Sequence, residues 1–283
     1  MVIFKKANAL SQYIDSLRHQ NKKIGFVPTM GALHQGHLSL IKASKEQCDI
    51  TVCSIFVNPT QFNDPKDFEK YPVTIEQDIS LLTKNNTNIL FLPSVHEIYP
   101  NGTNNLPHYE LGELESILEG KYRPHHFQGV CQVIDRLLNI IRPDKLFLGQ
   151  KDYQQCMVIN KLIELTQLRV ETSILPTLRV NDGLAMSSRN MRLSEEGRKK
   201  AVALYNTLLY IKEHHFKKGI PLLIEESKTK LSVAGFEGID YISIADAKTL
   251  RPINNLEESS ESLILAAAFL EGVRLIDNML LSV

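Results

Sequence analysis

The chain has 283 residues, of which 43% are hydrophobic, enough for one large domain or two unequal ones. Its 32 basic residues balance its 32 acidic ones, so no positive field would gather nucleic acid or an anionic membrane surface. The four cysteines form no CxxC pair, and no segment has the pattern of a signal peptide or a membrane span. We therefore expect a soluble, cytoplasmic protein, large enough for an enzyme with a cleft and without a nucleic-acid or membrane partner.

Helices and strands alternate along the first 175 residues. Apolar residues at helical spacing predict a helix over residues 10–17, and a buried strand follows at residues 24–27. Further helices are expected to begin at His37, after Thr74, at Val130 and at Gln154. Strands between them are expected at residues 50–57, 89–92, 145–148 and 170–175. Thr74, with Gln77 three residues later, also matches a capping box.

This alternation predicts an α/β protein with a Rossmann-like, doubly wound parallel sheet. Right-handed crossovers in such a sheet place ligands beyond the carboxyl ends of the strands. The loops after Val27, Val57 and Leu148 should therefore line a binding site.

The pattern changes in the last third of the chain. A long charged helix is predicted from about Ser194, and a second helical stretch at residues 222–231. Strands are predicted at residues 241–244, 263–270 and 274–276, with a polar loop at residues 254–261. We expect a Rossmann-like domain over residues 1–176 and a smaller C-terminal α+β domain over residues 177–283.

The segment PTMGALHQGH, residues 28–37, lies between the first buried strand and the start of a helix. Backbone N–H groups and the helix dipole favour an anion there, and Gly36 lets a phosphate approach the main chain. His34 and His37 can face the same phosphate oxygens. The alternatives are two histidines that cap the helix, or a metal site, which is disfavoured because no acidic or cysteine ligand lies beside them.

Three other polar segments follow predicted strands or lie at the domain boundary. FVNPTQF contains Asn58 and Gln61, which can hold a small polar substrate or form only a turn. GQKDYQQ offers Lys151 for phosphate and Asp152 for a ribose hydroxyl, or an exposed ion-paired turn. DGLAMSSRN, residues 182–190, can close on a triphosphate or serve as a solvated linker.

The predicted topology brings these segments to one edge of the sheet, which favours a nucleotide site over scattered surface loops. The segment RPHHF at residues 123–127 can either reach this site or form a packed loop. The chain has no Walker A motif, no GxGxxG fingerprint and no zinc-type cysteine spacing.

Taken together, the motifs resemble the pantothenate synthetase family of pantoate–β-alanine ligases, within the nucleotidyltransferase superfamily that carries a His-x-Gly-His signature. PTMGALHQGHLSL, SIFVNPTQF, HHFQGV, KDYQQ, DGLAMSSRN and RLIDN occur in the family's order through nearly the whole chain. The resemblance implies a reaction in two steps. Pantoate and ATP give pantoyl-adenylate and pyrophosphate, and β-alanine then displaces AMP to give pantothenate.

The resemblance also implies site residues. ATP-binding residues would be Met30, Gly31, Ala32, Leu33, His34, Gln35, Gly36, His37, Gly149, Gln150, Lys151, Asp152, Leu178, Met186, Ser187, Ser188 and Arg189. Among them, His34, His37, Lys151, Ser188 and Arg189 would act on the phosphates, with His37 also as the proton donor. Pantoate and β-alanine would contact Gln61, Gln155, Asn58 and Met30. Mg²⁺ would arrive with ATP, held mainly by its phosphates, and the protein would be a homodimer.

Three positions depart from the family pattern: Gln150 and Gln77 stand where acidic residues are common, and Cys156 stands where leucine is common. Residues 77 and 150 are therefore not expected to act by charge, and the other expected site residues are unaffected. Three rival interpretations remain at this point: another nucleotidyltransferase of the superfamily, a non-catalytic nucleotide-binding regulator, and a class I aminoacyl-tRNA synthetase. The last is disfavoured by the neutral net charge.

Overall fold

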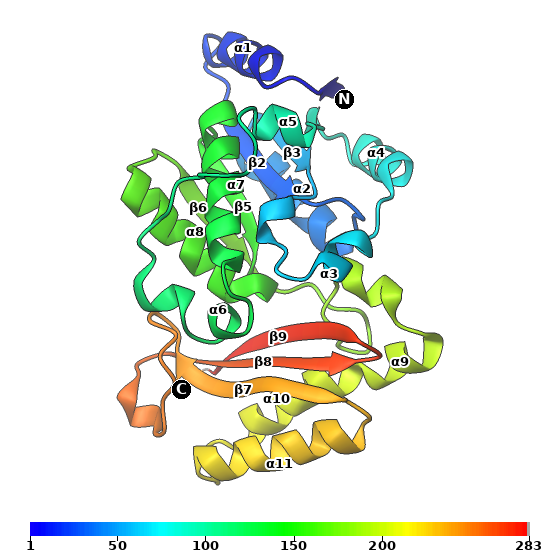
Figure 1. Cartoon of the computed structure of the whole chain (residues 1–283), viewed down its shortest axis with the longest axis vertical. Helices are drawn as coiled ribbons and strands as arrows, with labels where there is room; N and C mark the ends of the chain where they lie inside the picture. The colour runs from blue at the N-terminus through cyan, green and yellow to red at the C-terminus, as the bar shows by residue number, and fades with distance from the viewer. Residues whose placement is uncertain (282–283) are drawn as a thin grey trace.

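Two β-sheets follow one another along the long axis of the molecule in the computed structural model, which describes residues 1–281 (Figure 1). The larger sheet has six parallel strands in the order β1-β4-β3-β2-β5-β6. These strands are β1 (Val2–Phe4), β2 (Ile24–Thr29), β3 (Ile50–Ile55), β4 (Ile89–Phe91), β5 (Lys145–Gly149) and β6 (Glu171–Leu175). The strand order reverses between β2 and β5, which confirms the predicted doubly wound, Rossmann-like sheet.

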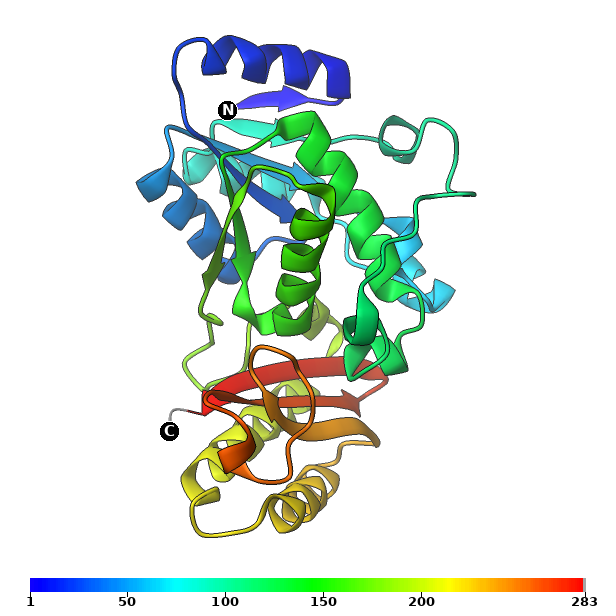
Figure 2. The ribbon, with the colours of Figure 1, turned by 90° about the vertical axis from the view of Figure 1, so that its left-hand side faces the viewer.

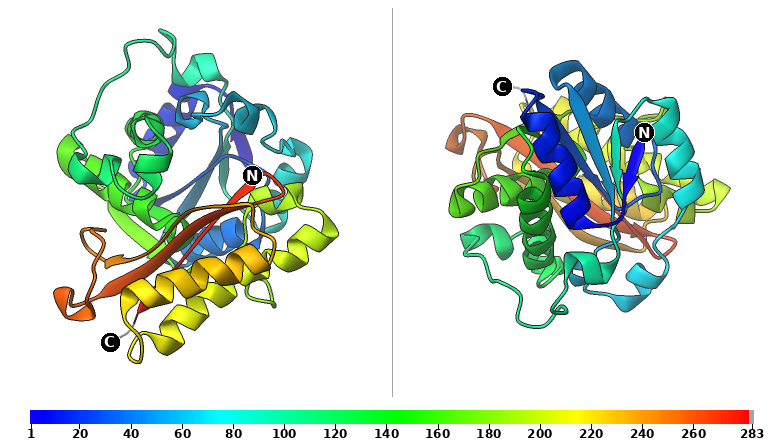
Figure 3. Two further views of the ribbon diagram at one scale, coloured as in Figure 1. Left: turned by 60° about the horizontal axis from the view of Figure 1, so that its bottom comes forward. Right: turned by 90° about the horizontal axis from the view of Figure 1, so that it is seen from above.

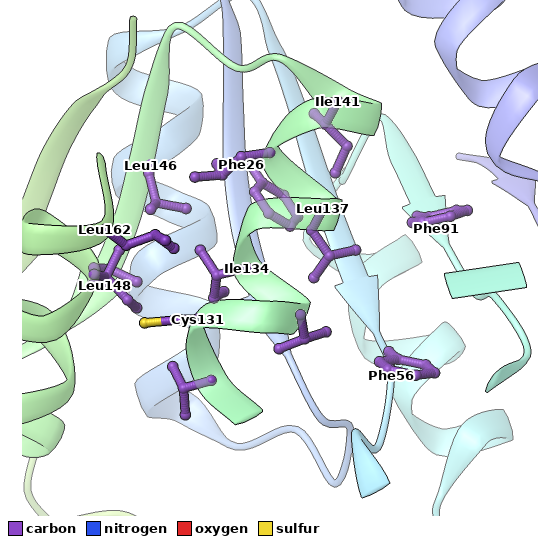
Figure 4. Packing of buried hydrophobic residues seen from close by; sticks show 14 of the residues in the cluster. Phe26, Phe56, Phe91, Cys131, Ile134, Leu137, Ile141, Leu146, Leu148 and Leu162 are labelled. Atoms are coloured by element: carbon purple, nitrogen blue, oxygen red, sulfur yellow. The ribbon is translucent and has the colours of Figure 1, made fainter. Parts of the chain in front are cut away.

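Helices cover both faces of this sheet (Figure 2). On one face lie α1 (Ala7–Arg18), α7 (His126–Ile141) and α8 (Tyr153–Thr166), and on the other α2 (Gln35–Gln47) and α4 (Ile75–Lys84). Side chains alternate along each strand, so Phe26 and Leu146 pack with α7 while Val27 packs with α2. Figure 4 shows Ile134 and Leu137 of α7 against the strands. Burial on both faces explains why these strands are apolar runs.

The second sheet is antiparallel, in the order β7-β8-β9. Its strands are β7 (Gly238–Asp246), β8 (Ser262–Leu270) and β9 (Val273–Leu281), and the helices before it are α9 (Glu195–Lys200), α10 (Val202–His214) and α11 (Ile220–Val233). Helices α10 and α11 lie side by side and pack on the sheet in a separate apolar cluster (Figure 3). The predicted smaller α+β part is thus confirmed, whereas the domain boundary at residues 176 and 177 stays a prediction.

Short elements connect these layers. They are α3 (Pro65–Glu69), α5 (Val95–Ile98), α6 (Glu119–Tyr122) and the 3₁₀ turns Pro59–Gln61, Gly112–Glu115, Gln150–Asp152, Ser188–Arg192 and Leu256–Glu258. The sequence patterns did not predict them, because a single turn is too short to show a hydrophobic period. The three-residue edge strand β1 was missed for the same reason.

Three expectations about local structure were wrong. The long helix expected from Ser194 is two helices interrupted at Ala201. The helix expected at His37 begins at Gln35. Thr74 makes no capping bond with its side chain, because its hydroxyl donates to Asp78 Oδ1 at 3.1 Å instead. From residue 1 to residue 281, no helix has both the length and the apolar character needed to cross a membrane.

Candidate functional site

A cavity lies where the carboxyl ends of the parallel strands face the antiparallel sheet. The loops after β2, β3, β5 and β6 line it, together with the start of α7 and residues 276–278 of β9. The predicted loops after residues 27, 57 and 148 therefore meet at one cavity. The switch point between β2 and β5 opens into it, as expected for ligand sites of doubly wound sheets.

The loop between β2 and α2 is held in an uncommon backbone conformation. Gly31 and Ala32 are consecutive residues with positive φ, at 84° and 47°. The carboxylate of Asp78, which is 1% exposed, accepts hydrogen bonds from Ala32 N at 2.9 Å and Leu33 N at 2.8 Å. A left-handed alanine is strained by about 1–2 kcal/mol, so these bonds from α4 stabilise the loop.

His34 and His37 cap the N-terminus of α2 reciprocally. His34 Nδ1 accepts from Gly36 N at 3.2 Å, and His37 Nδ1 accepts from His34 N at 3.3 Å. A side chain at residue 36 would lie 2.9 Å from the His34 ring, so this cap requires Gly36. The two rings lie 4.0 Å apart between centroids, and both line the cavity.

The caps fix the protonation of both imidazoles. Because each Nδ1 accepts a hydrogen bond, each neutral ring carries its proton on Nε2. Burial and the charge of Lys151 lower the pKa of His34 to about 4. Burial, His34 and Lys151 hold the pKa of His37 well below its usual value. At neutral pH the helix N-terminus thus presents two uncharged Nε2–H donors. The capping alternative considered from the sequence and the anion-binding interpretation are therefore compatible.

The loop after β5 carries Lys151 into the cavity but turns Gln150 away. The Gln150 side chain lies 3.3 Å from Asn278 Oδ1, and Asn278 Nδ2 donates to the carbonyls of Gln150 and Lys151 at 2.9 and 2.8 Å. Gln150 does not line the cavity, whereas Gly149, Lys151 and Asp152 do. Asn278 of β9 thereby anchors this loop, a role that the sequence analysis did not assign.

The segment 186–189 crosses the cavity from the C-terminal part of the chain. Ser188 is 6% exposed and donates to the carbonyl of Ala32 at 3.0 Å, so it joins the loop after β6 to the loop after β2. Arg189 donates to Asp67 Oδ2 at 2.9 Å, and Arg192 donates to Asp67 Oδ1 at 2.7 Å. Both side chains are thus held near the cavity by one carboxylate of α3.

Asn58 supports Gln61 from a fully buried position. Asn58 Nδ2 donates to Gln61 Oε1 at 3.2 Å and to the carbonyl of Gly129 at 3.0 Å, and Asn58 Oδ1 accepts from Tyr99 at 2.8 Å. Gln61 Nε2 faces the weak acceptor Met30 Sδ at 3.1 Å. The Gln61 amide N–H is therefore the group that this network presents to a ligand.

Two adjacent glutamines at the start of α8 have opposite environments. Gln154 is 2% exposed, and its amide bonds to the main chain of Leu114, Ile117 and Glu119 at 2.8, 3.0 and 3.0 Å. Gln155 lines the same cavity, and within residues 1–281 its amide has no hydrogen-bond partner. Only Gln155 is free to bind a ligand.

The segment RPHHF does reach the cavity, which the sequence left open. His126 Nδ1 donates to the carbonyl of Gln61 at 2.8 Å, and Arg123 donates to His126 Nε2 at 3.1 Å. Burial and the charge of Arg123 lower the pKa of His126 to about 3, so its ring is neutral. Both residues line the cavity.

A buried ion pair connects this region to the antiparallel sheet. Glu119 of α6 accepts from Arg274 of β9 at 2.7 and 2.8 Å and from Tyr241 of β7 at 2.6 Å. Burial opposes the charge of Glu119, yet the hydrogen bonds and charge of Arg274 lower its pKa to about 2. These residues come from distant segments, so no local sequence signal could have grouped them.

The structure sorts the expected site residues into two groups. Those that line the cavity are Met30, His34, Gly36, His37, Asn58, Gln61, Gly149, Lys151, Asp152, Gln155, Leu178, Met186, Ser187, Ser188 and Arg189. Those outside its lining are Gly31, Ala32, Leu33, Gln35 and Gln150. In the part of the chain that the structure describes, no three His, Cys, Asp or Glu side chains are grouped as metal ligands.

Comparison with known sequences gives one consistent result. A family model described as Pantoate-beta-alanine ligase matches residues 2–280. Pantothenate synthetase of Cytophaga hutchinsonii is 40% identical, with 99% of each chain covered. Pantothenate synthetase of Buchnera aphidicola subsp. Schizaphis graminum is 43% identical, with 98% of each chain covered.

Solved structures agree with the sequence matches. The structure of pantothenate synthetase from Thermus thermophilus is similar with a TM-score of 0.91, 35% identity and 99% coverage of both chains. The pantoate-beta-alanine ligase of Francisella tularensis, complexed with beta-gamma ATP and beta-alanine, is similar with a TM-score of 0.84 and 39% identity. That comparison covers 99% of this chain and 97% of the other.

Proposed function

The chain belongs to the family of pantoate–β-alanine ligases, which make pantothenate, and we propose that its cavity joins the two substrates through a pantoyl-adenylate formed from ATP. One observation carries this proposal: two neutral imidazoles at the N-terminus of α2 present Nε2–H donors to the cavity beside Lys151. Hydrogen-bond donors and positive charge placed together in this way suit phosphate chemistry governed by electrostatics.

ATP would lie across the carboxyl ends of β2 and β5. His34, His37 and Lys151 would contact the phosphates from one side, and segment 186–189, with Ser188 and Arg189, from the other. Gly149 and Asp152 would contact the ribose, and the main chain at Leu178 the adenine. Gly31, Ala32, Leu33 and Gln35 would act by shaping the loop, and Gln150 by anchoring its own loop to β9, because these residues lie outside the cavity lining.

Pantoate would bind between the strand ends and α8. Its polar groups would be held by Gln61 and by Gln155, whose amide makes no hydrogen bond to any of residues 1–281. Asn58 supports Gln61 through the bond to Oε1, and Met30 lies beside it. The same Gln61 would face β-alanine in the second step.

The first step forms a bond between a carboxylate oxygen of pantoate and the α-phosphorus of ATP, and the bond to pyrophosphate breaks. Charge grows on the departing pyrophosphate, where His34, His37, Lys151 and Ser188 would stabilise it. The neutral His37 ring would act as a hydrogen-bond donor through Nε2–H and would keep its proton, unlike the proton donor that the family resemblance implies. In the second step the neutral amine of β-alanine attacks the acyl carbon. A C–N bond forms, the C–O bond to AMP breaks, and the nitrogen loses a proton to water.

Neither step needs a strong nucleophile from the protein. Orientation of bound reactants can supply ~7–11 kcal/mol, and each preorganised donor ~2.7–4 kcal/mol. Mg²⁺ would enter with the ATP phosphates, whose charge it would neutralise. Mg²⁺ keeps several of its waters and binds largely through substrate phosphates, so the protein need not supply a cage.

Residues 1–176 would bind ATP and pantoate, and residues 177–283 would act as a lid that keeps water from the mixed anhydride. The Ser188–Ala32 bond joins these two parts at the cavity, as a closed lid would. We further propose a cytoplasmic homodimer, on the strength of the family alone.

Pyrophosphate release tests the proposal. ATP and Mg²⁺ with pantoate should give pyrophosphate without β-alanine, and pantothenate and AMP should appear only after β-alanine is added. Binding of ATP without pantoate-dependent pyrophosphate would refute the catalytic assignment and favour a nucleotide-binding regulator.

A further inference from the structure

Three cationic side chains line the cavity within residues 1–281: Arg123, Lys151 and Arg189. Arg189 is hydrogen-bonded to Asp67, and Lys151 lies beside the two histidines that face the phosphates. Arg123 differs from both. Among residues 1–281, the nearest carboxylate oxygen to Arg123 is on Glu119, 3.8 Å away and beyond hydrogen-bond distance.

Glu119 is not available to neutralise Arg123. Both of its oxygens accept from Arg274, and one accepts from Tyr241 as well. Arg123 is itself largely buried, with 15% of its side chain exposed. A guanidinium in such a place gains from a carboxylate that can accept two of its N–H groups.

The position of Arg123 relative to Gln61 is fixed by His126. The ring of His126 spans the two, since Nδ1 donates to the Gln61 carbonyl and Nε2 accepts from Arg123 Nη1. Gly129 of the same helix lets the Gln61 turn approach, because a side chain there would lie 2.3 Å from the carbonyl oxygen of Thr60. The imidazole ring of His126 therefore lies between Arg123 and the turn that carries Gln61.

The residues assigned so far leave the carboxylate of β-alanine without a cationic partner. The amine of β-alanine is consumed in the bond to pantoate, but its carboxylate stays charged throughout. A carboxylate moved from water into a closed cavity requires a cationic or hydrogen-bonding partner. The phosphates of ATP occupy Lys151 and Arg189 in the proposed function.

We propose that Arg123 binds the carboxylate of the incoming amino acid and that His126 is the residue that positions it. This inference rests on the proposed function and names the group that selects an amino acid over a simple amine. Burial and the nearby charge of Arg189 lower the pKa of Arg123 to about 10, against the opposing charge of Glu119. A bound carboxylate would relieve that unfavourable electrostatic environment.

The test compares the two half-reactions of Arg123→Met with those of the wild type. The KM for β-alanine should rise on the order of 10- to 100-fold, because a charge-assisted hydrogen bond is lost. Pantoate-dependent pyrophosphate release without β-alanine should stay unchanged. Arg123→Lys should give a smaller rise. Arg251→Met removes an exposed arginine that pairs with Glu113 outside the cavity, and it should change neither half-reaction.

3-Aminopropan-1-ol gives a second readout, because it keeps the amine and chain length of β-alanine but lacks the carboxylate. The wild type should strongly prefer β-alanine, and Arg123→Met should lose that preference. His126→Gln, which keeps an acceptor near the Nε2 position, should retain more affinity for β-alanine than His126→Ala.

The proposal is overturned if the β-alanine KM is unchanged in both Arg123 variants, or if Arg123→Met still discriminates against the alcohol. Failure of the proposed function looks different. In that case the wild type itself releases no pyrophosphate with pantoate, whatever residue stands at position 123.

Discussion

Asp78 of α4 holds the main chain of Ala32 through a 2.9 Å hydrogen bond and the next residue through a second one. The carboxylate does not line the cavity, yet it fixes the loop that leads into both cavity histidines. It therefore links the packing of one crossover helix to the geometry of the proposed phosphate site.

Asp78→Asn should weaken this loop. The amide NH₂ would face a main-chain N–H that needs an acceptor, and a buried donor left unpaired costs about 1–3 kcal/mol. We expect a loss of that size in the free energy of unfolding, measured in urea, together with a higher KM for ATP. Glu76→Gln on the exposed side of the same helix is the matched control. An Asp78→Asn protein with wild-type stability and ATP KM would contradict the anchoring role.

His34→Ala and His37→Ala should each lower kcat for pantoate-dependent pyrophosphate release by about 10²–10³-fold, the effect of losing one preorganised donor. Stability should fall much less, by about 0.5–2 kcal/mol for the lost helix cap. His108→Ala, at an exposed position, serves as the control. Unchanged turnover in both cavity variants would refute the phosphate assignment.

Gln154 and Gln155 offer a test with opposite outcomes at neighbouring positions. Gln155→Ala should raise the KM for pantoate on the order of 10-fold or more, because a hydrogen bond to a charged ligand is lost, while stability stays near wild type. Gln154→Ala should instead lower the free energy of unfolding by about 1–3 kcal/mol, because it leaves buried main-chain groups unpaired. Steady-state kinetics and urea unfolding distinguish the two. A reversed pattern would show that the substrate contact is misassigned.

The neutral histidines predict how stability depends on pH. Folded His34 and His126 have pKa values of about 4 and about 3, below the value of about 6.5 expected when unfolded. The unfolded chain therefore binds more protons below pH 6.5, so the free energy of unfolding should fall as pH drops from about 6.5 toward 4. Each such group contributes about 1.4 kcal/mol per pH unit inside that window.

Urea unfolding at several values between pH 7 and pH 5 checks this slope. His126→Asn removes the titrating group and should make the slope shallower than in the wild type. Equal slopes in the wild type and His126→Asn would mean that the folded His126 ring accepts a proton more readily than its surroundings imply.

The sequence predicted the part of the fold that depends on long hydrophobic periods. The strands of the parallel sheet and its main crossover helices lay where apolar runs and helical spacing placed them, because each is buried on a continuous face. The edge strand Val2–Phe4 and the one-turn helices gave no such period. The Thr74 capping box failed because the threonine hydroxyl bonds to the Asp78 side chain instead of to the main chain of the helix.

The sequence predicted the site residues that lie together in one loop. It missed the contacts between residues that are far apart in the sequence. His34 and His37 share a local motif that also caps a helix. Glu119 and Arg274 are 155 residues apart, and only the meeting of α6 with β9 brings them together. Asn278 meets the loop of Lys151 in the same way.

The most direct test of the central claim follows the oxygen atoms of pantoate. Pantoate labelled with ¹⁸O in its carboxylate would be incubated with ATP, Mg²⁺ and β-alanine, and the products examined by mass spectrometry. A pantoyl-adenylate requires one labelled oxygen to appear in AMP and none in pyrophosphate. Label in inorganic phosphate, with ADP as the second product, would mean attack on the γ-phosphorus and would contradict the adenylate route.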